Sequence, residues 1–132
     1  MARLACLGAL LLALVPAACG GGDDDADDAR RVIEEFVAAT NARDGGQLCG
    51  ELLTQEYLEK YTGATGDRAE DACQQQLELI RGLKLRLVSI DEVEVDGDEA
   101  VVRATIATGG QRMKRRFGLA KEDGEWKLDS GS

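Results

Sequence analysis

The chain has 132 residues, a formal net charge of −9 and an aromatic content of only 4%. This length fits one small domain, whose core must be built mainly from aliphatic side chains. The acidic balance argues against nucleic acid as a partner, because phosphate backbones are bound by clustered Lys and Arg. The chain contains no histidine, which excludes His-based acid–base catalysis, Ser-His-Asp and Cys-His nucleophiles, and His-ligated metals.

An apolar run follows Arg3 at residues 4–15. It is typical of the hydrophobic region of a secretory signal and shorter than the ~20 residues that a spanning helix needs. Residues 14–19 read LVPAAC and overlap the end of this run. They resemble the lipobox of bacterial lipoproteins, whose cysteine takes a diacylglycerol thioether before cleavage. This resemblance implies a signal peptide at residues 1–18 and a lipid on Cys19. The alternative is an ordinary signal peptide that is cleaved near Ala18 and releases a secreted chain.

Residues 20–28 read GGGDDDADD. Glycines give the backbone freedom, and clustered aspartates repel one another. We therefore expect residues 19–28 to be a tether without fixed structure between the lipid and a folded domain at residues 29–129, followed by a short tail at 130–132. The resulting location is the extracytoplasmic face of the cell membrane.

Apolar residues at helical spacing predict three helices in the first part of the domain. The first starts at a cap formed by Asp27 or Asp28 and ends in the NARDGG segment at residues 41–46. A short second helix carries Cys49, and Thr54 caps a short third helix. Such short helices need tertiary support.

A fourth helix is predicted to start at Asp67, with Glu70 three residues later as in a capping box, and it carries Cys73. Of the four cysteines, Cys6 lies in the signal peptide and Cys19 is the expected lipid site. The remaining pair in an exported domain predicts a disulfide between Cys49 and Cys73, in preference to two free thiols. Two cysteines without histidine do not favour zinc.

From Lys84 the apolar period changes to two, which indicates strands. A phase slip near Ser89 and Ile90 predicts a bulge. Turns at Asp96-Gly97, at Gly109-Gly110 and at residues 122–125 separate four strands. Helices followed by an antiparallel meander predict an α+β domain with the helices packed on one face of the sheet.

The segments IEEFVAATNARDGGQLCGELLT, DACQQQLELI, VDGDEAVVRATI and FGLAKEDGEWKLD follow one another in this order. Their order resembles the nuclear transport factor 2-like (cystatin-like cone) superfamily, and more narrowly the small exported lipoproteins of actinobacteria that share its fold. The resemblance implies a curved sheet and a cone between sheet and helices. The superfamily includes isomerases, cyclases, ligand-binding proteins and scaffolds, so the fold does not determine the function. Without histidine, without an acid on an inward strand position and with one strand fewer, this chain is expected not to be an enzyme.

Two groups of residues are candidates for ligand binding in the cone. Tyr57 and Tyr61 share one face of a short helix and would line a small pocket closed by Trp126. Arg115 lies between Met113 and Phe117 on the inward face of the third strand and would grip an anion. The alternatives are that the aromatic residues are core and that Arg115 reaches the sheet edge or pairs with Glu92 or Glu94. The candidate set is Tyr57, Tyr61, Arg115, Phe117 and Trp126.

Arg112, Lys114 and Arg116 alternate on the other face of the third strand. Arg86 and Arg103 would join them if the strand register allows. This basic stripe is a candidate docking surface for an anionic partner such as a wall polymer or an acidic protein. The alternative is a solvated sheet face balanced by the many acids.

The sequence thus predicts a membrane-anchored extracytoplasmic lipoprotein with a non-catalytic binding or accessory domain. No catalytic residue, metal or cofactor is expected. The expected partners are the membrane, through the lipid on Cys19, and an envelope protein or a small ligand; a homodimer through the sheet is a further hypothesis. The alternative functions are a small cyclase- or isomerase-type enzyme and a structural protein-interaction module.

Overall fold

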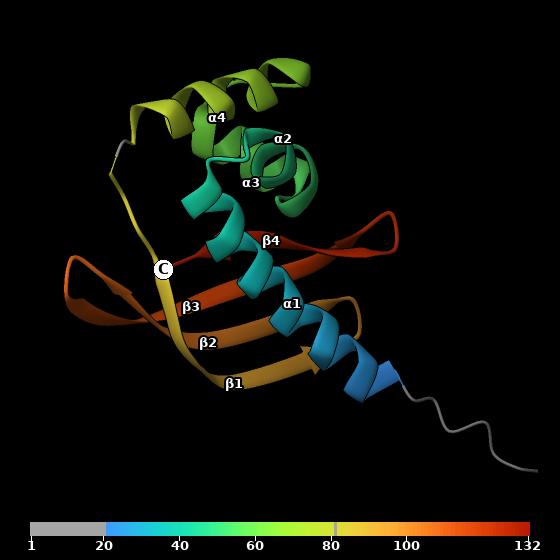
Figure 1. The fold of residues 1–132 in the computed structure, drawn as a ribbon. Coiled ribbons are helices and arrows are strands. Elements are labelled where there is room, and N and C mark those ends of the chain that lie inside the picture. Colours follow the sequence, from blue (N-terminus) through green and yellow to red (C-terminus); the bar gives the residue numbers. More distant parts are fainter. Residues whose placement is uncertain (1–20, 81) are drawn as a thin grey trace, which may run out of the picture.

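The structure is a computed structural model that describes residues 21–80 and 82–132. Helices cover one face of a curved four-stranded sheet (Figure 1). The helical elements are α1 (Gly21–Ala42), α2 (Gly45–Gln47), the π-helix η1 (Leu48–Leu52), α3 (Gln55–Thr62) and α4 (Asp67–Leu79). The strands are β1 (Arg86–Asp96), β2 (Glu99–Thr108), β3 (Gln111–Glu122) and β4 (Glu125–Gly131). The predicted α+β class is confirmed. The predicted signal peptide at residues 1–18 and the predicted lipid site at Cys19 lie outside the described residues.

Helix α1 starts earlier than the sequence predicts. The expectation that residues 19–28 lack fixed structure is wrong for residues 21–28, which form the first turns of α1, and neither Asp27 nor Asp28 is its cap. Carboxylates near a helix N-terminus are favoured by the helix dipole. Asp27 and Asp28 also pair with Arg30 and Arg31 one turn later, at 3.1 and 3.3 Å. These local interactions offset the repulsion between aspartates.

The shorter helices have the expected positions and partly different caps. The hydroxyl of Thr54 accepts a hydrogen bond from the amide of Tyr57 at 3.1 Å, so the predicted cap of α3 is confirmed. Asp67 is already inside α4, and Gly66, with φ of 60°, takes the cap position in its place. Glu70 binds the side chain of Gln74 within the helix, so the predicted capping box is absent from α4.

The strands pair in the order β1-β2-β3-β4, each antiparallel to its neighbours. Register shifts between Leu87 and Ser89 and between Ile90 and Glu92 confirm the bulge predicted in β1. A bulge bends its strand and increases the twist. Both residues of the β2–β3 turn, Gly109 and Gly110, have positive φ, which the type I′ hairpin turn requires.

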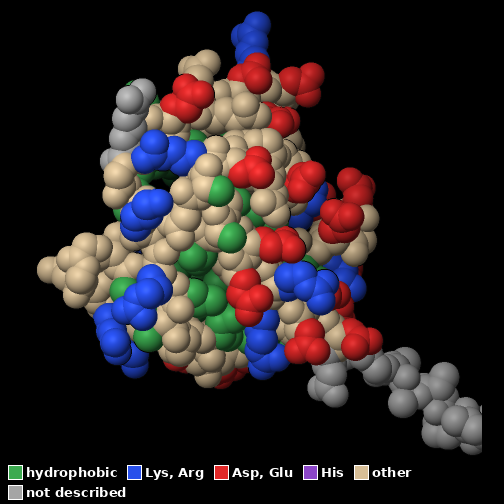
Figure 2. All heavy atoms as spheres, in the orientation of Figure 1, with side chains coloured by type: hydrophobic (Ala, Val, Ile, Leu, Met, Phe, Trp, Pro, Cys, Tyr) green, Lys and Arg blue, Asp and Glu red, His purple; other side chains and the backbone are tan. Residues whose placement is uncertain are grey.

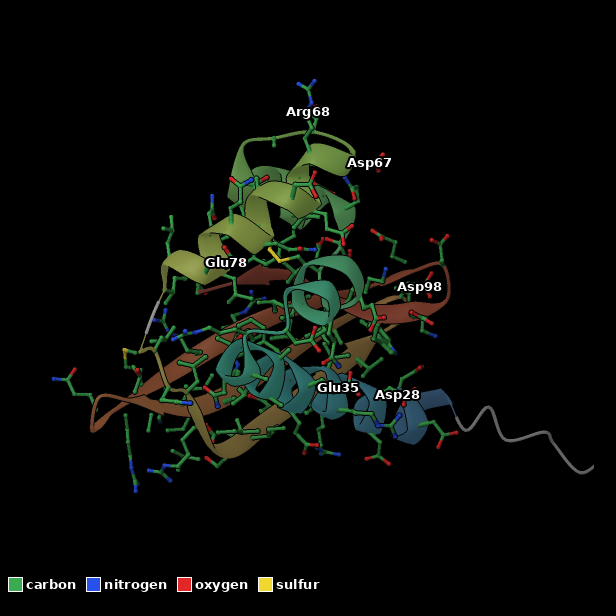
Figure 3. The ribbon with its side chains drawn as sticks, turned by 45° about the horizontal axis from the view of Figure 1, so that its top comes forward. Asp28, Glu35, Asp67, Arg68, Glu78 and Asp98 are labelled. Atoms are coloured by element: carbon green, nitrogen blue, oxygen red, sulfur yellow. A yellow bond between two sulfur atoms is a disulfide. The ribbon has the colours of Figure 1, made fainter. Side chains whose placement is uncertain are left out.

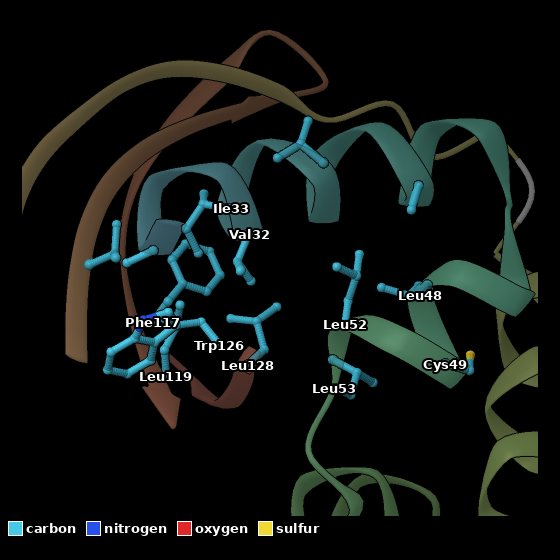
Figure 4. Close-up of a cluster of buried hydrophobic side chains, with 14 of the residues drawn as sticks. Val32, Ile33, Leu48, Cys49, Leu52, Leu53, Phe117, Leu119, Trp126 and Leu128 are labelled. Atoms are coloured by element: carbon cyan, nitrogen blue, oxygen red, sulfur yellow. The ribbon is translucent and has the colours of Figure 1, made fainter. Parts of the chain in front are cut away.

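The core lies between α1 and the inner face of the sheet (Figure 4). Ile33 of α1 is completely buried, and Phe117, Trp126 and Leu128 of the last two strands face the same layer. Buried aliphatic side chains supply most of this core, as the low aromatic content requires. None of the helices within residues 21–80 has both the length and the apolar character that a membrane span requires.

Candidate functional site

A cavity of about 190 Å³ lies among the helices and the segment that leads from α4 to β1. Its lining is mostly apolar, and among the described residues no charged side chain takes part in it. The lining residues are Phe36, Thr40, Leu48, Leu53, Tyr57, Tyr61, Cys73, Leu77, Ile80 and Leu83.

Cys73 lines the cavity and forms a disulfide with Cys49, which is the bridge that the sequence predicts. It joins η1 to α4, two elements that are 24 residues apart along the chain at this point. Figure 3 shows the bridge as a yellow bond between the helices. Closing this loop limits the freedom of the unfolded chain and keeps the two helices together in the native state.

Helix α3 is attached to the last strand, which fixes the position of its tyrosines. The amide of Thr54 donates to the carbonyl of Leu128 at 2.8 Å, and the Thr54 hydroxyl donates to Asp129 at 2.7 Å. Leu53 also forms an isolated parallel bridge with Leu128. The start of α3 is thereby held on β4, and Tyr57 comes one turn later on the side of the cavity.

Three polar groups interrupt the apolar lining. The hydroxyl of Thr40 is already used, because it donates to the carbonyl of Phe36 at 2.7 Å. The rings of Tyr57 and Tyr61 lie 6.3 Å apart. Burial, with a smaller effect from Tyr61, raises the pKa of the half-buried Tyr57. Tyr57 is therefore a neutral phenol at physiological pH and can donate a hydrogen bond to a ligand oxygen.

The rim of the cavity exposes apolar surface to solvent. Tyr61 is 52% exposed and Ile80 is 39% exposed, although both line the cavity. Leu79, the last residue of α4, is 82% exposed and does not line it. Exposed apolar groups beside a concave site are a common feature of binding sites.

The predicted ligand-binding residues do not form one site. Tyr57 and Tyr61 line the cavity. Phe117 is buried next to it, with its ring 5.9 Å from that of Phe36. Trp126 does not close the cavity: it is buried beside the first turns of α1, where its indole nitrogen donates to Asp25 at 3.1 Å.

Arg115 is also outside the cavity. Its backbone pairs with the buried Ala104, as an inward position requires, but its side chain is exposed. The reason is that β4 pairs with β3 from Phe117 onwards and Ser132 extends this pairing only to Arg116, so Arg115 lies beyond the end of the last strand. The alternative of an ion pair with Glu92 or Glu94 is not found among the described residues, and Glu92 pairs with Arg103 at 3.3 Å.

The sequence predicts only two of the ten lining residues, Tyr57 and Tyr61, as pocket residues. The other eight are Phe36, Thr40, Leu48, Leu53, Cys73, Leu77, Ile80 and Leu83. Phe36 and Thr40 belong to the apolar stripe of α1, whose spacing does not distinguish core from cavity wall. Ile80 and Leu83 follow the end of α4. Two large apolar residues in such a short connection are a sequence signal that indicates the rim of a cavity.

The strand register brings the basic residues together on the outer face of the sheet. Arg103 pairs with Arg116, Thr105 with Lys114, and Ala107 with Arg112. On the other side, Arg86 also pairs with Ala107. The register therefore places Arg86 and Arg103 beside Arg112, Lys114 and Arg116. All five side chains are exposed.

The described residues include no group of three or more His, Cys, Asp or Glu side chains with a geometry that could hold a metal ion. No protein-family model matches the chain, and no curated protein sequence matches it.

Solved structures nevertheless resemble the chain. A nuclear transport factor 2-like protein from Cytophaga hutchinsonii matches with a TM-score of 0.58 and 18% identity, over 80% of this chain and 93% of its own. A second such protein, of unknown function, from Silicibacter pomeroyi matches with a TM-score of 0.56 and 17% identity, over 83% and 93%. The intermembrane space region of the chloroplast protein ARC6 matches with a TM-score of 0.54 and 19% identity, over 82% and 95%. The chain thus has the nuclear transport factor 2-like fold, as its sequence predicts.

Proposed function

We propose that this chain is a lipid-anchored envelope protein whose domain binds a small apolar ligand in the cavity beside Tyr57, without transforming it. The observation that carries the proposal is the cavity itself. It combines an apolar lining with a half-buried phenol and an apolar rim.

The size of the cavity limits the ligand. Sites for drug-sized molecules have volumes of roughly 300–1,000 Å³, whereas this cavity has about 190 Å³. It suits a short hydrocarbon chain, or the apolar end of a longer molecule whose polar part stays in solvent. The Tyr57 hydroxyl favours ligands that carry an acceptor oxygen next to the apolar part.

The location is inferred from the N-terminal sequence. LVPAAC supports lipid attachment at Cys19, and the Cys49–Cys73 disulfide supports an oxidising compartment outside the cytoplasm. One acyl chain anchors weakly and two or more hold firmly, so a diacylglycerol on Cys19 would keep the domain at the membrane surface.

Ligand binding is tested with the full chain in neutral detergent and 1-octanol as the probe, followed by nuclear magnetic resonance. We expect saturable shifts in residues around Tyr57. The variant Ile80→Trp places a larger side chain at the rim and should abolish the shifts. Leu79→Trp is the matched control, because Leu79 is adjacent, more exposed and outside the lining.

Equal responses of the Trp variants, or shifts spread evenly over the surface, would refute binding in the cavity. Recovery of chemically changed ligand would favour the cyclase- or isomerase-type alternative. The anchor is tested separately by the intact mass of chain extracted from membranes, with Cys19→Ser as the variant and Cys6→Ser as the control. A wild-type mass without added lipid would refute the anchor and leave the cavity proposal standing.

A further inference from the structure

Charge is distributed unevenly along this molecule. Residues 21–80 contain 15 acidic and 5 basic residues, whereas residues 82–132 contain 10 acidic and 9 basic ones. Lys and Arg side chains gather around the end of the β2–β3 hairpin, at the left of the view in Figure 2. We call one group of residues the basic strip. Its members are Lys84, Arg86, Arg103, Arg112, Lys114 and Arg116.

The two ends of the sheet carry opposite charge. The basic strip starts at the end where β1 begins and where Gly109-Gly110 turns the chain. The β1–β2 and β3–β4 hairpins turn at the other end, and α1 begins there with its aspartates. Asp28 and Asp98 both lie on that side of the molecule in Figure 3. The acidic residues at that end are Asp24, Asp25, Asp27, Asp28, Asp96, Asp98, Glu99, Glu122, Asp123 and Glu125.

The first part of the strip surrounds a hollow of about 350 Å³. Arg86 and Arg112 approach it from β1 and β3, on the two sides of Ala107, which is only 7% exposed between them. Lys84, Thr108 and the Gly109-Gly110 turn complete the lining, and no acidic side chain of the described residues takes part. Guanidinium groups are suited to bidentate binding of phosphate.

A second hollow of about 370 Å³ continues the strip. Its lining combines four basic and two acidic residues with Ala104 and Ser132. The charged residues are Arg103, Lys114, Arg115, Arg116, Asp91 and Glu92. Each acid is engaged: Glu92 pairs with Arg103 at 3.3 Å, and Asp91 accepts hydrogen bonds from Ser89 and Thr105 at 2.7 and 2.8 Å. The second hollow is therefore a weaker anion position than the first, and the two lie in series along neighbouring strands.

The first hollow of the strip lies far from Gly21, the first described residue after the proposed anchor. The side-chain amide of Asn41 donates to the carbonyl of Leu85 and accepts from its amide, both at 2.7 Å. This pair holds the start of β1 at the C-terminal end of α1. From Gly21 to Asn41 the helix axis measures about 30 Å, at 1.5 Å per residue. Electrostatic attraction to lipid headgroups falls off within a Debye length of about 8 Å.

We infer that the basic strip binds a linear polymer bearing repeated phosphate groups in the aqueous space beyond the membrane, in preference to lipid headgroups. The choice of polymer over headgroups rests on the proposed anchor at Cys19, whereas binding of phosphate rests on the strip alone. Two hollows in series favour a polymer over a single phosphate ion, because the second contact becomes intramolecular after the first. The acidic remainder of the surface would repel the polymer and restrict it to the strip.

The test measures binding of long-chain polyphosphate to the full chain in neutral detergent, with inorganic phosphate as the monovalent probe. We expect polyphosphate to bind at least about tenfold more tightly per chain than inorganic phosphate, as expected for multivalent contact. The double variant R86Q/R112Q should lower this affinity at least about tenfold. It should also reduce the slope of log affinity against log salt by about 1.4, because each phosphate contact contributes about 0.7.

The matched control is K60Q/R68Q, which removes the same charge from exposed positions on the helices and should leave the affinity unchanged. Equal losses in the two double variants would overturn the inference. Tight binding of the C19S chain to phosphatidylserine vesicles, lost in R86Q/R112Q, would overturn the choice of a polymer. Binding of 1-octanol is measured on the same samples. Loss of 1-octanol binding would count against the cavity proposal, and loss of polyphosphate binding would count against the basic strip.

Discussion

The carboxylate of Asp25 accepts a hydrogen bond at 3.1 Å from the indole nitrogen of Trp126, 101 residues later in the chain. The ammonium group of Lys121 lies 3.3 Å from the same carboxylate oxygen and 5.3 Å from the centre of the Trp126 ring. These contacts join the first turns of α1 to the β3–β4 hairpin. The folded domain therefore starts before Asp25 and follows closely after Cys19.

We expect Asp25→Ala to lower the free energy of unfolding more than Asp25→Asn, because the amide keeps an acceptor for Trp126 whereas alanine removes both interactions. The indole NH resonance of Trp126, the only tryptophan, should shift in both variants. Asp24→Ala, a change at an exposed neighbour, is the control and should leave that resonance in place. An unchanged indole resonance in Asp25→Ala would contradict the contact.

The same carboxylate predicts a pH dependence. The hydrogen bond from Trp126, followed by the interaction with Lys121, lowers the pKa of Asp25 from its ordinary value of 3.8. A depressed native pKa contributes stability above the unfolded pKa, and this contribution is lost as the pH falls through the native value. The stability difference between the wild type and Asp25→Asn should be constant near neutral pH and shrink below about pH 3.8. Urea titrations at several pH values measure it.

Removal of the disulfide should destabilise the domain and disturb the cavity. For a loop of this length the chain-entropy model gives a loss of about 3 kcal/mol in the free energy of unfolding of Cys49→Ala/Cys73→Ala. Binding of 1-octanol should weaken as well, because Cys73 lines the cavity. Reduction of the wild type should reproduce both effects in urea denaturation and in the binding assay. Equal stability of the oxidised and reduced wild type would contradict this prediction.

Asn41→Ala removes two hydrogen bonds to the backbone of Leu85 and should lower the free energy of unfolding by about 2 kcal/mol. Because those bonds hold the start of β1, polyphosphate binding through Lys84 and Arg86 should weaken in folded Asn41→Ala. Gln75→Ala, at an exposed position of α4, is the control for both measurements. If Asn41→Ala and the control bind polyphosphate with equal affinity, Asn41 does not contribute to the position of Lys84 and Arg86.

Tyr57→Phe tests the proposed hydrogen bond to the ligand. Loss of one hydrogen bond worth about 1 kcal/mol predicts about fivefold weaker binding of 1-octanol. Binding of octane, which offers no acceptor, should not change. Tyr61→Phe is the matched control on the same helix, because the Tyr61 ring is more exposed than that of Tyr57. It should leave the affinity for 1-octanol nearly unchanged. A similar loss for octane would show that the hydroxyl acts through packing and does not contact the ligand.

Local patterns in the sequence predicted a large part of the architecture. The period-two segments and their glycine turns predicted the four-stranded meander, and the phase slip in β1 predicted the bulge. Thr54 was recognisable as a cap because capping depends on residues within one turn. The even number of cysteines left after the signal peptide and Cys19 predicted the disulfide. Each of these features depends on neighbouring residues or on a simple count.

The N-terminal aspartates show where local reasoning failed. Their mutual repulsion indicated a segment without structure, but Asp25 has Trp126 and Lys121 as partners at the other end of the chain. Arg115 shows the same limit: its place in the alternation is inward, and the short β4 leaves it exposed. Neither effect is visible in a local pattern.

The sequence by itself determined the fold class, the strand turns, the disulfide pair and which side of β3 carries its alternating basic residues. Only the tertiary structure decided that Tyr57 meets Phe36, Ile80 and Leu83 around a cavity, and that Arg86 and Arg112 flank Ala107. The physical reason is the range of the interactions. Hydrophobic periodicity and capping act within a few residues, whereas a cavity and a strand register depend on how distant segments pack, which a local pattern does not contain.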